Sequence, residues 1–128
     1  IASDHAPHDQ ESKRVPFAQA AAGVIGVETM LPVALEIHHR GDAGLLDLLA
    51  RMTVRPAEIL GLPQGRLAKG APADLVLFDL NRAWKIDAAM LKSKSKNSAF
   101  DGKPVEGRVL RTIVDGRIVY QADSANQR

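Results

Sequence analysis

A carboxylate and two imidazoles lie within five positions at the start of the chain, in the string IASDHAPH (residues 1–8). Asp4, His5 and His8 are the kinds of side chain that bind hard or borderline cations or transfer protons near neutral pH. Pro7 rules out a continuous helix here and pushes the residue before it to extended geometry. We therefore predict that the cluster lies where a strand ends and a loop begins, which is where α/β proteins place their chemistry.

The residues alone leave two interpretations of this cluster open. In the first, the three side chains are solvated turn residues or helix caps. In the second they are functional, and the backbone then limits their roles. On an extended backbone Asp4 and His5 point to opposite faces, so they cannot easily bind the same atom. A metal-facing carboxylate at Asp4, with His8 turned back toward a substrate, is therefore a better functional hypothesis than a three-ligand cage.

Composition bounds the class of protein. The chain has 128 residues, 45% of them hydrophobic, which is enough for one core. It begins on Ile1, in an apolar run directly before the cluster, which suggests a piece of a longer protein. No apolar stretch approaches membrane-spanning length and there is no cysteine, so we expect a soluble, cytoplasmic protein without disulfides or thiolate metal sites. A net charge of +2 and few aromatic residues argue against nucleic-acid binding.

The first half of the sequence has helical periodicity. A short helix is predicted over residues 17–22, and Gly23 and Gly26 then interrupt it. The Ala22–Gly23 backbone could contact a substrate, but a plain helix C-cap fits equally well. Longer helices are predicted over residues 29–40, 45–52 and 53–61.

Side-chain spacing predicts which faces of these helices are buried. The second carries an apolar stripe that needs a partner surface, formed by Leu45, Leu48, Leu49 and Met52. In the third, Ile59 and Leu60 are expected to face inward, with Gly61 at the end. The pair His38-His39 falls in the last turn of the first helix, where imidazolium complements the helix dipole, and we interpret it as structural.

From about residue 65 the pattern is that of strands. A buried strand is predicted over residues 73–79, a shorter one over 84–86, and a single helical turn over 88–91. A polar loop follows over residues 92–107, with Phe100 as its anchor. Its basic run could hold an anion, although a solvated loop is the better interpretation. Strands over 109–114 and 117–120 flank Asp115-Gly116, a strong hairpin signal, and residues 121–128 are expected to fray.

Several strings in the chain together resemble the dihydroorotases, members of the amidohydrolase superfamily of TIM-barrel metal hydrolases. IASDHAPH resembles their eighth barrel strand and the loop after it, and GVIGVET (23–29) looks like a second signature. RPAEILGL (55–62) resembles the last barrel helix, and GRLAKGAPADLVLFD (65–79) the return into a small β-sandwich. KSKNSAF (94–100) and VDGRIVY (114–120) are similar to the carboxy-terminal β pattern. Hydantoinases and allantoinases share this architecture, but the DHAPH string favours dihydroorotase.

The resemblance implies a fold and a division of the chain. The expected class is α/β followed by β, as a C-terminal fragment of a larger enzyme. Residues 1–64 would form the last strand and helices of the TIM barrel. Residues 65–128 would form part of the composite β-sandwich domain.

The resemblance also implies a function. The complete enzyme would interconvert L-dihydroorotate and N-carbamoyl-L-aspartate in pyrimidine biosynthesis, with zinc as cofactor. Asp4 would contact the metal and shuttle the proton between the zinc-bound hydroxide and the leaving nitrogen. His8 would bind the substrate carboxylate, and the backbone at Ala22 and Gly23 would contact the substrate.

Two departures from the family pattern limit these expectations. Ala21-Ala22-Gly23 stands where the family commonly has Pro-Phe-Gly, and the family's remaining metal ligands have no counterpart in this sequence. We therefore expect the isolated chain to be inactive and to bind zinc poorly. It is also expected to self-associate, because the stripe at 45–52 would lose its neighbours.

The sequence leaves three alternatives to an active dihydroorotase open. One is a catalytically silent dihydroorotase-like subunit that serves as a scaffold for aspartate transcarbamoylase. Another is a related hydantoinase or allantoinase. The last is a binding module outside the superfamily, for which the match of several separate strings would have to be accidental.

Overall fold

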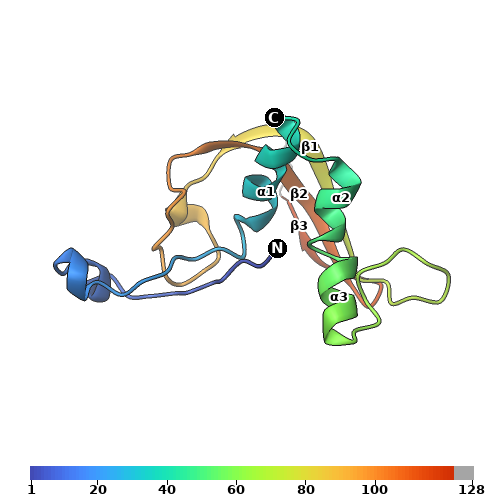
Figure 1. The fold of residues 1–128 in the computed structure, drawn as a ribbon, viewed down its shortest axis with the longest axis horizontal. Helices are drawn as coiled ribbons and strands as arrows, with labels where there is room; N and C mark the ends of the chain where they lie inside the picture. The colour runs from blue at the N-terminus through green and yellow to red at the C-terminus, as the bar shows by residue number, and fades with distance from the viewer. Residues whose placement is uncertain (123–128) are drawn as a thin grey trace.

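The computed structural model describes residues 1–122, in which three helices precede three strands (Figure 1). The helices are α1 (Met30–His39), α2 (Leu45–Ala50) and α3 (Val54–Leu60), and the strands are β1 (Leu75–Lys85), β2 (Pro104–Val114) and β3 (Arg117–Gln121). Short 3₁₀ turns occupy Glu11–Lys13, Phe17–Gln19 and Ala88–Met90. The segment before α1 is mostly extended and reaches away from the helices and the sheet. Within residues 1–122, no helix is long and apolar enough to cross a membrane.

The strands form one antiparallel sheet in the order β1-β2-β3. Asp115 and Gly116 connect β2 to β3 with φ values of 49° and 73°. Positive φ at both central residues is the backbone of the tight hairpin turn that an Asp-Gly pair favours. The hairpin predicted at this position is confirmed.

The boundaries predicted for β1 and β2 are wrong. Residues 73–79 and 84–86 do not form separate strands, because β1 runs continuously through both, with a break in register between Asp79 and Ala83. The loop predicted over residues 92–107 ends before Pro104, where β2 begins. Pro104 and Val105 already pair with Lys85 and Trp84. Cross-strand pairing therefore extends both strands beyond what their own sequences indicate.

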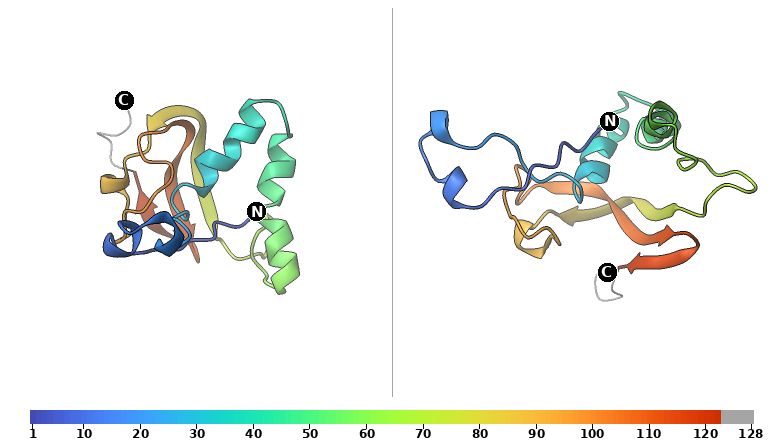
Figure 2. Two further views of the ribbon diagram at one scale, coloured as in Figure 1. Left: turned by 60° about the vertical axis from the view of Figure 1, so that its left-hand side comes forward. Right: turned by 90° about the horizontal axis from the view of Figure 1, so that it is seen from below.

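The core lies between the helices and the sheet. Leu35 of α1 and Leu48 of α2 are buried together with Ala34, and Phe78 and Leu80 of β1 pack against them. Figure 2 shows the helices on one side of the sheet. The apolar stripe of α2 thus finds its partner within the chain, and Leu48 is only 2% exposed. The expectation that this stripe would be left in water is therefore wrong, whereas self-association of the chain stays a prediction.

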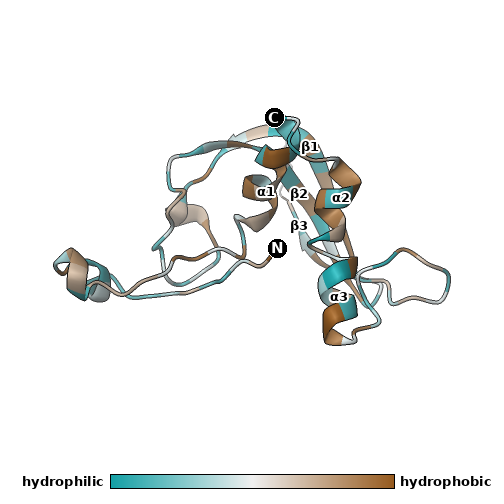
Figure 3. Cartoon of the chain, in the orientation of Figure 1, coloured by the Kyte–Doolittle hydropathy of each residue, from teal (hydrophilic) through white to brown (hydrophobic). Residues whose placement is uncertain are grey.

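Two other helical predictions also fail. In α3, Ile59 and Leu60 are 83% and 70% exposed, whereas Ala57 is buried. Residues two apart on a helix point to opposite sides, so a face built on Ala57 turns Ile59 outward; the apolar end of α3 is visible in Figure 3. The helix expected over 17–22 shrinks to the 3₁₀ turn at Phe17–Gln19.

Candidate functional site

Two segments distant in sequence lie side by side at the predicted site. His5 and Val24 form an isolated parallel bridge, in which the Ala6 N–H donates to the Val24 carbonyl at 2.9 Å. The strand end expected before Pro7 is thus reduced to a single bridge. The bridge brings the Asp4–His8 segment against the Gly23 turn, as the functional interpretation requires.

Two glycines make this close approach possible. A Cβ at Gly23 would lie 2.6 Å from the Cβ of Ala6, and a Cβ at Gly26 would lie 2.5 Å from the Ser3 carbonyl oxygen. Gly23 also has a φ of 101°, which L side chains rarely adopt. Gly23 is not a helix C-cap, because the 3₁₀ turn before it ends at Gln19. The group that approaches its backbone is the chain's own N-terminal segment, and contact with a substrate stays a prediction.

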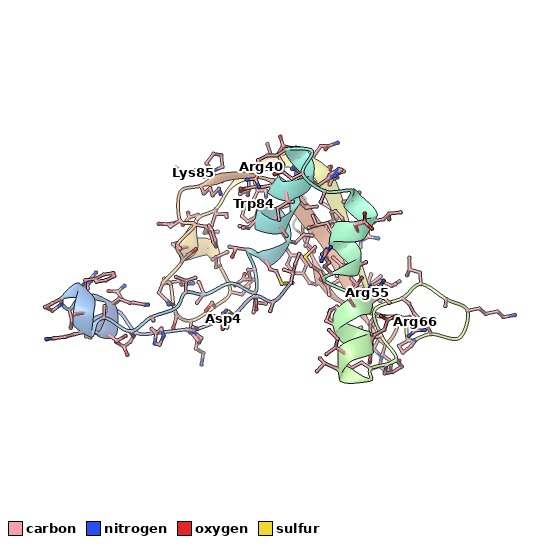
Figure 4. All side chains as sticks on the ribbon, viewed as in Figure 1. Asp4, Arg40, Arg55, Arg66, Trp84 and Lys85 are labelled. Carbon is pink, nitrogen blue, oxygen red and sulfur yellow. The ribbon has the colours of Figure 1, made fainter. Side chains whose placement is uncertain are left out.

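Asp4 is exposed, and its backbone has the unusual φ of 44°. The expectation of an extended backbone at Asp4 is therefore wrong. Its carboxylate makes no hydrogen bond or ion pair with residues 1–122. Left-handed backbone is uncommon for a residue other than glycine and gathers at functional sites, although aspartate tolerates it better than most. Figure 4 shows Asp4 on the N-terminal segment, away from the labelled Arg55 and Arg66.

His5 has a structural role that the sequence did not reveal. Its Nδ1 accepts the main-chain N–H of Gly26 at 3.1 Å. A neutral imidazole that accepts at Nδ1 carries its proton on Nε2, so neither nitrogen is free to ligate a metal in this arrangement. His5 fastens the two segments together.

His8 lies at the other end of the same segment, and its Nε2 is 2.8 Å from the carbonyl oxygen of Ala22. A carbonyl only accepts, so Nε2 must be the donor, which leaves Nδ1 available to another group. The half-buried His8 ring thus stands beside Ala22 and Gly23, and three of the predicted site residues are neighbours.

The structure adds contacts that sequence reasoning missed. The Lys13 ammonium donates to the Ala21 carbonyl and, at 2.6 Å, to the Gly23 carbonyl. The Glu28 carboxylate accepts the main-chain N–H groups of Lys92 and Ser93 at 2.8 and 2.9 Å. The basic run thus does receive an anionic group, but it belongs to Glu28 and is bound by the backbone. Nothing in the local sequence around Lys13 or Glu28 indicated either contact.

Asp9 orders the chain directly after His8. The main-chain N–H of Ser12 donates to its Oδ1 at 2.7 Å and holds the pKa of this carboxyl below its ordinary value of 3.8. A carboxyl whose pKa is lowered by folding stabilises the folded state at pH values above its pKa in the unfolded chain. This stabilisation is lost as the pH falls through its pKa in the folded chain. The turn after His8 is therefore expected to persist at neutral pH.

The described residues do not by themselves make up a metal site. No group of three or more His, Asp or Glu side chains in residues 1–122 could hold an ion. His38 contacts the Ala43 carbonyl at 3.1 Å, and His39 lies 3.5 Å from Glu106, so both serve the structure around α1. Asp4 contributes one exposed carboxylate, which is too few ligands for tight zinc binding.

The chain is similar in sequence and fold to known enzymes. A dihydroorotase from Wolbachia sp. subsp. Drosophila simulans (strain wRi) is 52% identical over 97% of this chain, which spans 28% of that relative's length. An L-hydantoinase (dihydropyrimidinase) structure from Arthrobacter aurescens is 36% identical, with a TM-score of 0.77, over 81% of this chain and 24% of the other. A D-hydantoinase (dihydropyrimidinase) structure from Thermus sp. shares the fold at 23% identity, with a TM-score of 0.84, over 92% of this chain and 27% of the other.

The sequence profile of the Amidohydrolase family matches residues 1–119, which is nearly the whole of the described chain. The match includes both segments of the candidate site and the three-stranded sheet up to residue 119 in β3. This chain belongs to the amidohydrolase family.

Proposed function

We propose that this chain is the C-terminal part of a dihydroorotase, which hydrolyses the cyclic amide of L-dihydroorotate to N-carbamoyl-L-aspartate and catalyses the reverse reaction in pyrimidine biosynthesis. The observation that carries the proposal is the bridge between His5 and Val24, which sets the segment that contains Asp4 and His8 against the segment that contains Gly23. The 52% identity to a dihydroorotase supports this substrate over hydantoin. The chain spans only about a quarter of that relative, so the activity is proposed for the complete enzyme.

Each site residue has a role that follows from its chemistry. In hydrolysis, water adds to the ring carbonyl, the carbon–nitrogen bond breaks and the nitrogen takes a proton. An exposed carboxylate with no internal partner, such as Asp4, can accept the proton from water and return it to the nitrogen. His8 can bind the substrate carboxylate through Nδ1 when protonated, while Nε2 stays on Ala22. The Ala22–Gly23 backbone lies beside His8 and would contact the same substrate.

We further propose that residues 1–64 complete the TIM barrel of this enzyme and that residues 65–128 belong to its β-sandwich domain. The complete enzyme would be cytoplasmic and homo-oligomeric and would carry zinc. Asp4 would be one zinc ligand, and the others would come from outside this chain. A partnership with aspartate transcarbamoylase belongs to the scaffold alternative.

The complete enzyme should be assayed on L-dihydroorotate, hydantoin and allantoin. We expect dihydroorotate to be hydrolysed with the highest kcat/KM. Preferential hydrolysis of hydantoin or allantoin would replace the proposal with the corresponding alternative. Absence of turnover on all three, together with stable binding to aspartate transcarbamoylase, would indicate the scaffold.

His8→Ala in the complete enzyme is expected to raise KM for dihydroorotate about 10- to 100-fold, with a smaller change in kcat. The reason is that a side chain used for binding in both ground and transition states acts mainly on KM. His38→Ala is the matched control, because its ring also contacts a main-chain carbonyl but lies on α1. Steady-state kinetics on both variants measure the difference, and equal KM values for His8→Ala and wild type would exclude His8 from substrate binding.

Residues 1–128 alone are expected to lose zinc on dialysis against a weak chelator. One carboxylate cannot supply the three or four protein ligands that zinc sites use. Metal analysis after dialysis measures the retained zinc, with the complete enzyme as the positive control. Retention of one equivalent by the isolated chain would show that it builds a metal site by itself.

A further inference from the structure

Asn97 reaches both segments of the candidate site from the loop between Ala88–Met90 and β2. Its Oδ1 accepts the main-chain N–H of His8 at 3.3 Å. Its Nδ2 donates to the Ala6 carbonyl at 2.9 Å and lies 3.4 Å from the Gly23 carbonyl. Its own main-chain carbonyl accepts the N–H of Ile25 at 3.2 Å. One half-buried amide thus contacts the chain on both sides of the bridge.

The neighbours of Asn97 in the loop make only local bonds. Lys96 donates to the Leu91 carbonyl, and the Ser98 hydroxyl accepts the N–H of Phe100. The loop is held near the site at a second point, where Glu28 binds Lys92 and Ser93. Removing the Asn97 amide would therefore break its side-chain contacts with His8, Ala6 and Gly23. The main-chain bond to Ile25 and the contacts with Glu28 would still hold the loop in place.

We propose that Asn97 is a positioning residue for substrate binding, which fixes the His8 backbone relative to the Gly23 turn. This inference rests on the proposed function, since it takes His8 and Gly23 as substrate contacts. The amide is suited to the task because it donates and accepts at once, and the two segments present one N–H and two carbonyls to it. Asn97 makes no bond to Asp4, so its effect should fall on binding more than on proton transfer.

The test is kinetic and uses the complete enzyme. Asn97→Ala is expected to raise KM for dihydroorotate about 10- to 100-fold while kcat falls less, because small displacements of binding groups have effects of this order. Asn97→Asp should also have a KM above that of the wild type. Its carboxylate can accept the N–H of His8 but cannot donate to the two carbonyls. Ser98→Ala is the matched control, and we expect wild-type KM for it. The proposal is overturned by wild-type KM in Asn97→Ala or Asn97→Asp, or by an equal rise in Ser98→Ala.

Deuterium exchange of the substrate-free enzyme gives a readout that does not depend on turnover. In Asn97→Ala, a peptide covering residues 4–9 should exchange faster than in wild type, because the His8 N–H loses its acceptor. Ser98→Ala should leave that peptide unchanged. If the wild-type enzyme hydrolyses another cyclic amide instead of dihydroorotate, the proposed function fails. The positioning role of Asn97 is then tested by the deuterium exchange of residues 4–9 and by KM for that other substrate. Unchanged exchange in Asn97→Ala overturns the positioning role under either function.

Discussion

Replacing Asp4 with asparagine in the complete enzyme is expected to lower kcat by about a hundredfold to ten-thousandfold, the range typical of a positioned acid or base. Asparagine keeps the size of the side chain and a coordinating oxygen, but it cannot accept a proton from water and return it to the ring nitrogen. It also tolerates the left-handed backbone that Asp4 adopts at a φ of 44°. The loss should therefore come from chemistry rather than from a change of fold. Initial rates on saturating dihydroorotate measure it.

Asp115 provides a matched control for this variant. It is likewise an exposed aspartate with positive φ, at 49°, but it lies in the hairpin turn rather than at the site. We expect Asp115→Asn to keep wild-type kcat and Asp4→Asn to keep the wild-type unfolding temperature. Turnover by Asp4→Asn at the wild-type rate would remove Asp4 from the proposed role.

Gly107→Ala is expected to destabilise the protein by about 2–5 kcal/mol. Gly107 is buried in β2 with a φ of 97°, and an added Cβ would lie 2.4 Å from Cδ1 of Leu35. Leu35 is fully buried, so it has little room to move. The expected cost combines about 1–2 kcal/mol for left-handed backbone with about 1–3 kcal/mol for overpacking. Urea denaturation measures the change in the free energy of unfolding.

Gly116→Ala separates these two contributions. Gly116 has a φ of 73°, but an added Cβ there would meet no atom within 4 Å. The free energy of unfolding of Gly116→Ala should therefore fall only by the cost of the left-handed backbone, about 1–2 kcal/mol. Equal stability of the two variants would show that Leu35 does not pack against Gly107 as described. The contact matters to the site because it joins the sheet to α1, which directly follows the Gly23–Thr29 segment.

Local signals in the sequence predicted local structure well. Asp115-Gly116 specified its hairpin because the turn depends on those two residues, and Gly61 ends α3 in the left-handed conformation expected of a glycine cap. The α2 stripe correctly predicted a packed helix. The limits of β1 and β2 were not predictable in the same way, because each strand extends as far as its partner continues to pair.

The candidate site depends on contacts between distant parts of the chain. Asn97 bonds to Ala6 across 91 positions, and His5 bonds to Gly26 across 21. Nothing in the periodicity of either segment encodes these pairings. The residues alone indicated Asp4 and His8 as reactive and Gly23 as permissive, and only the family resemblance placed them in one site. The outward position of Ile59 and Leu60 was missed because a short helix offers several possible buried faces.

The central claim is that this chain is part of an enzyme whose substrate is a cyclic amide that carries a carboxylate. Its most direct test compares L-dihydroorotate with dihydrouracil, the same ring without the carboxylate. If protonated His8 binds that carboxylate, the complete enzyme should prefer dihydroorotate by at least about 100-fold in kcat/KM, since a binding site discriminates strongly against an analogue that lacks its charged group. His8→Ala should remove most of that preference. Equal kcat/KM for the two rings, or faster hydrolysis of dihydrouracil, would contradict the account.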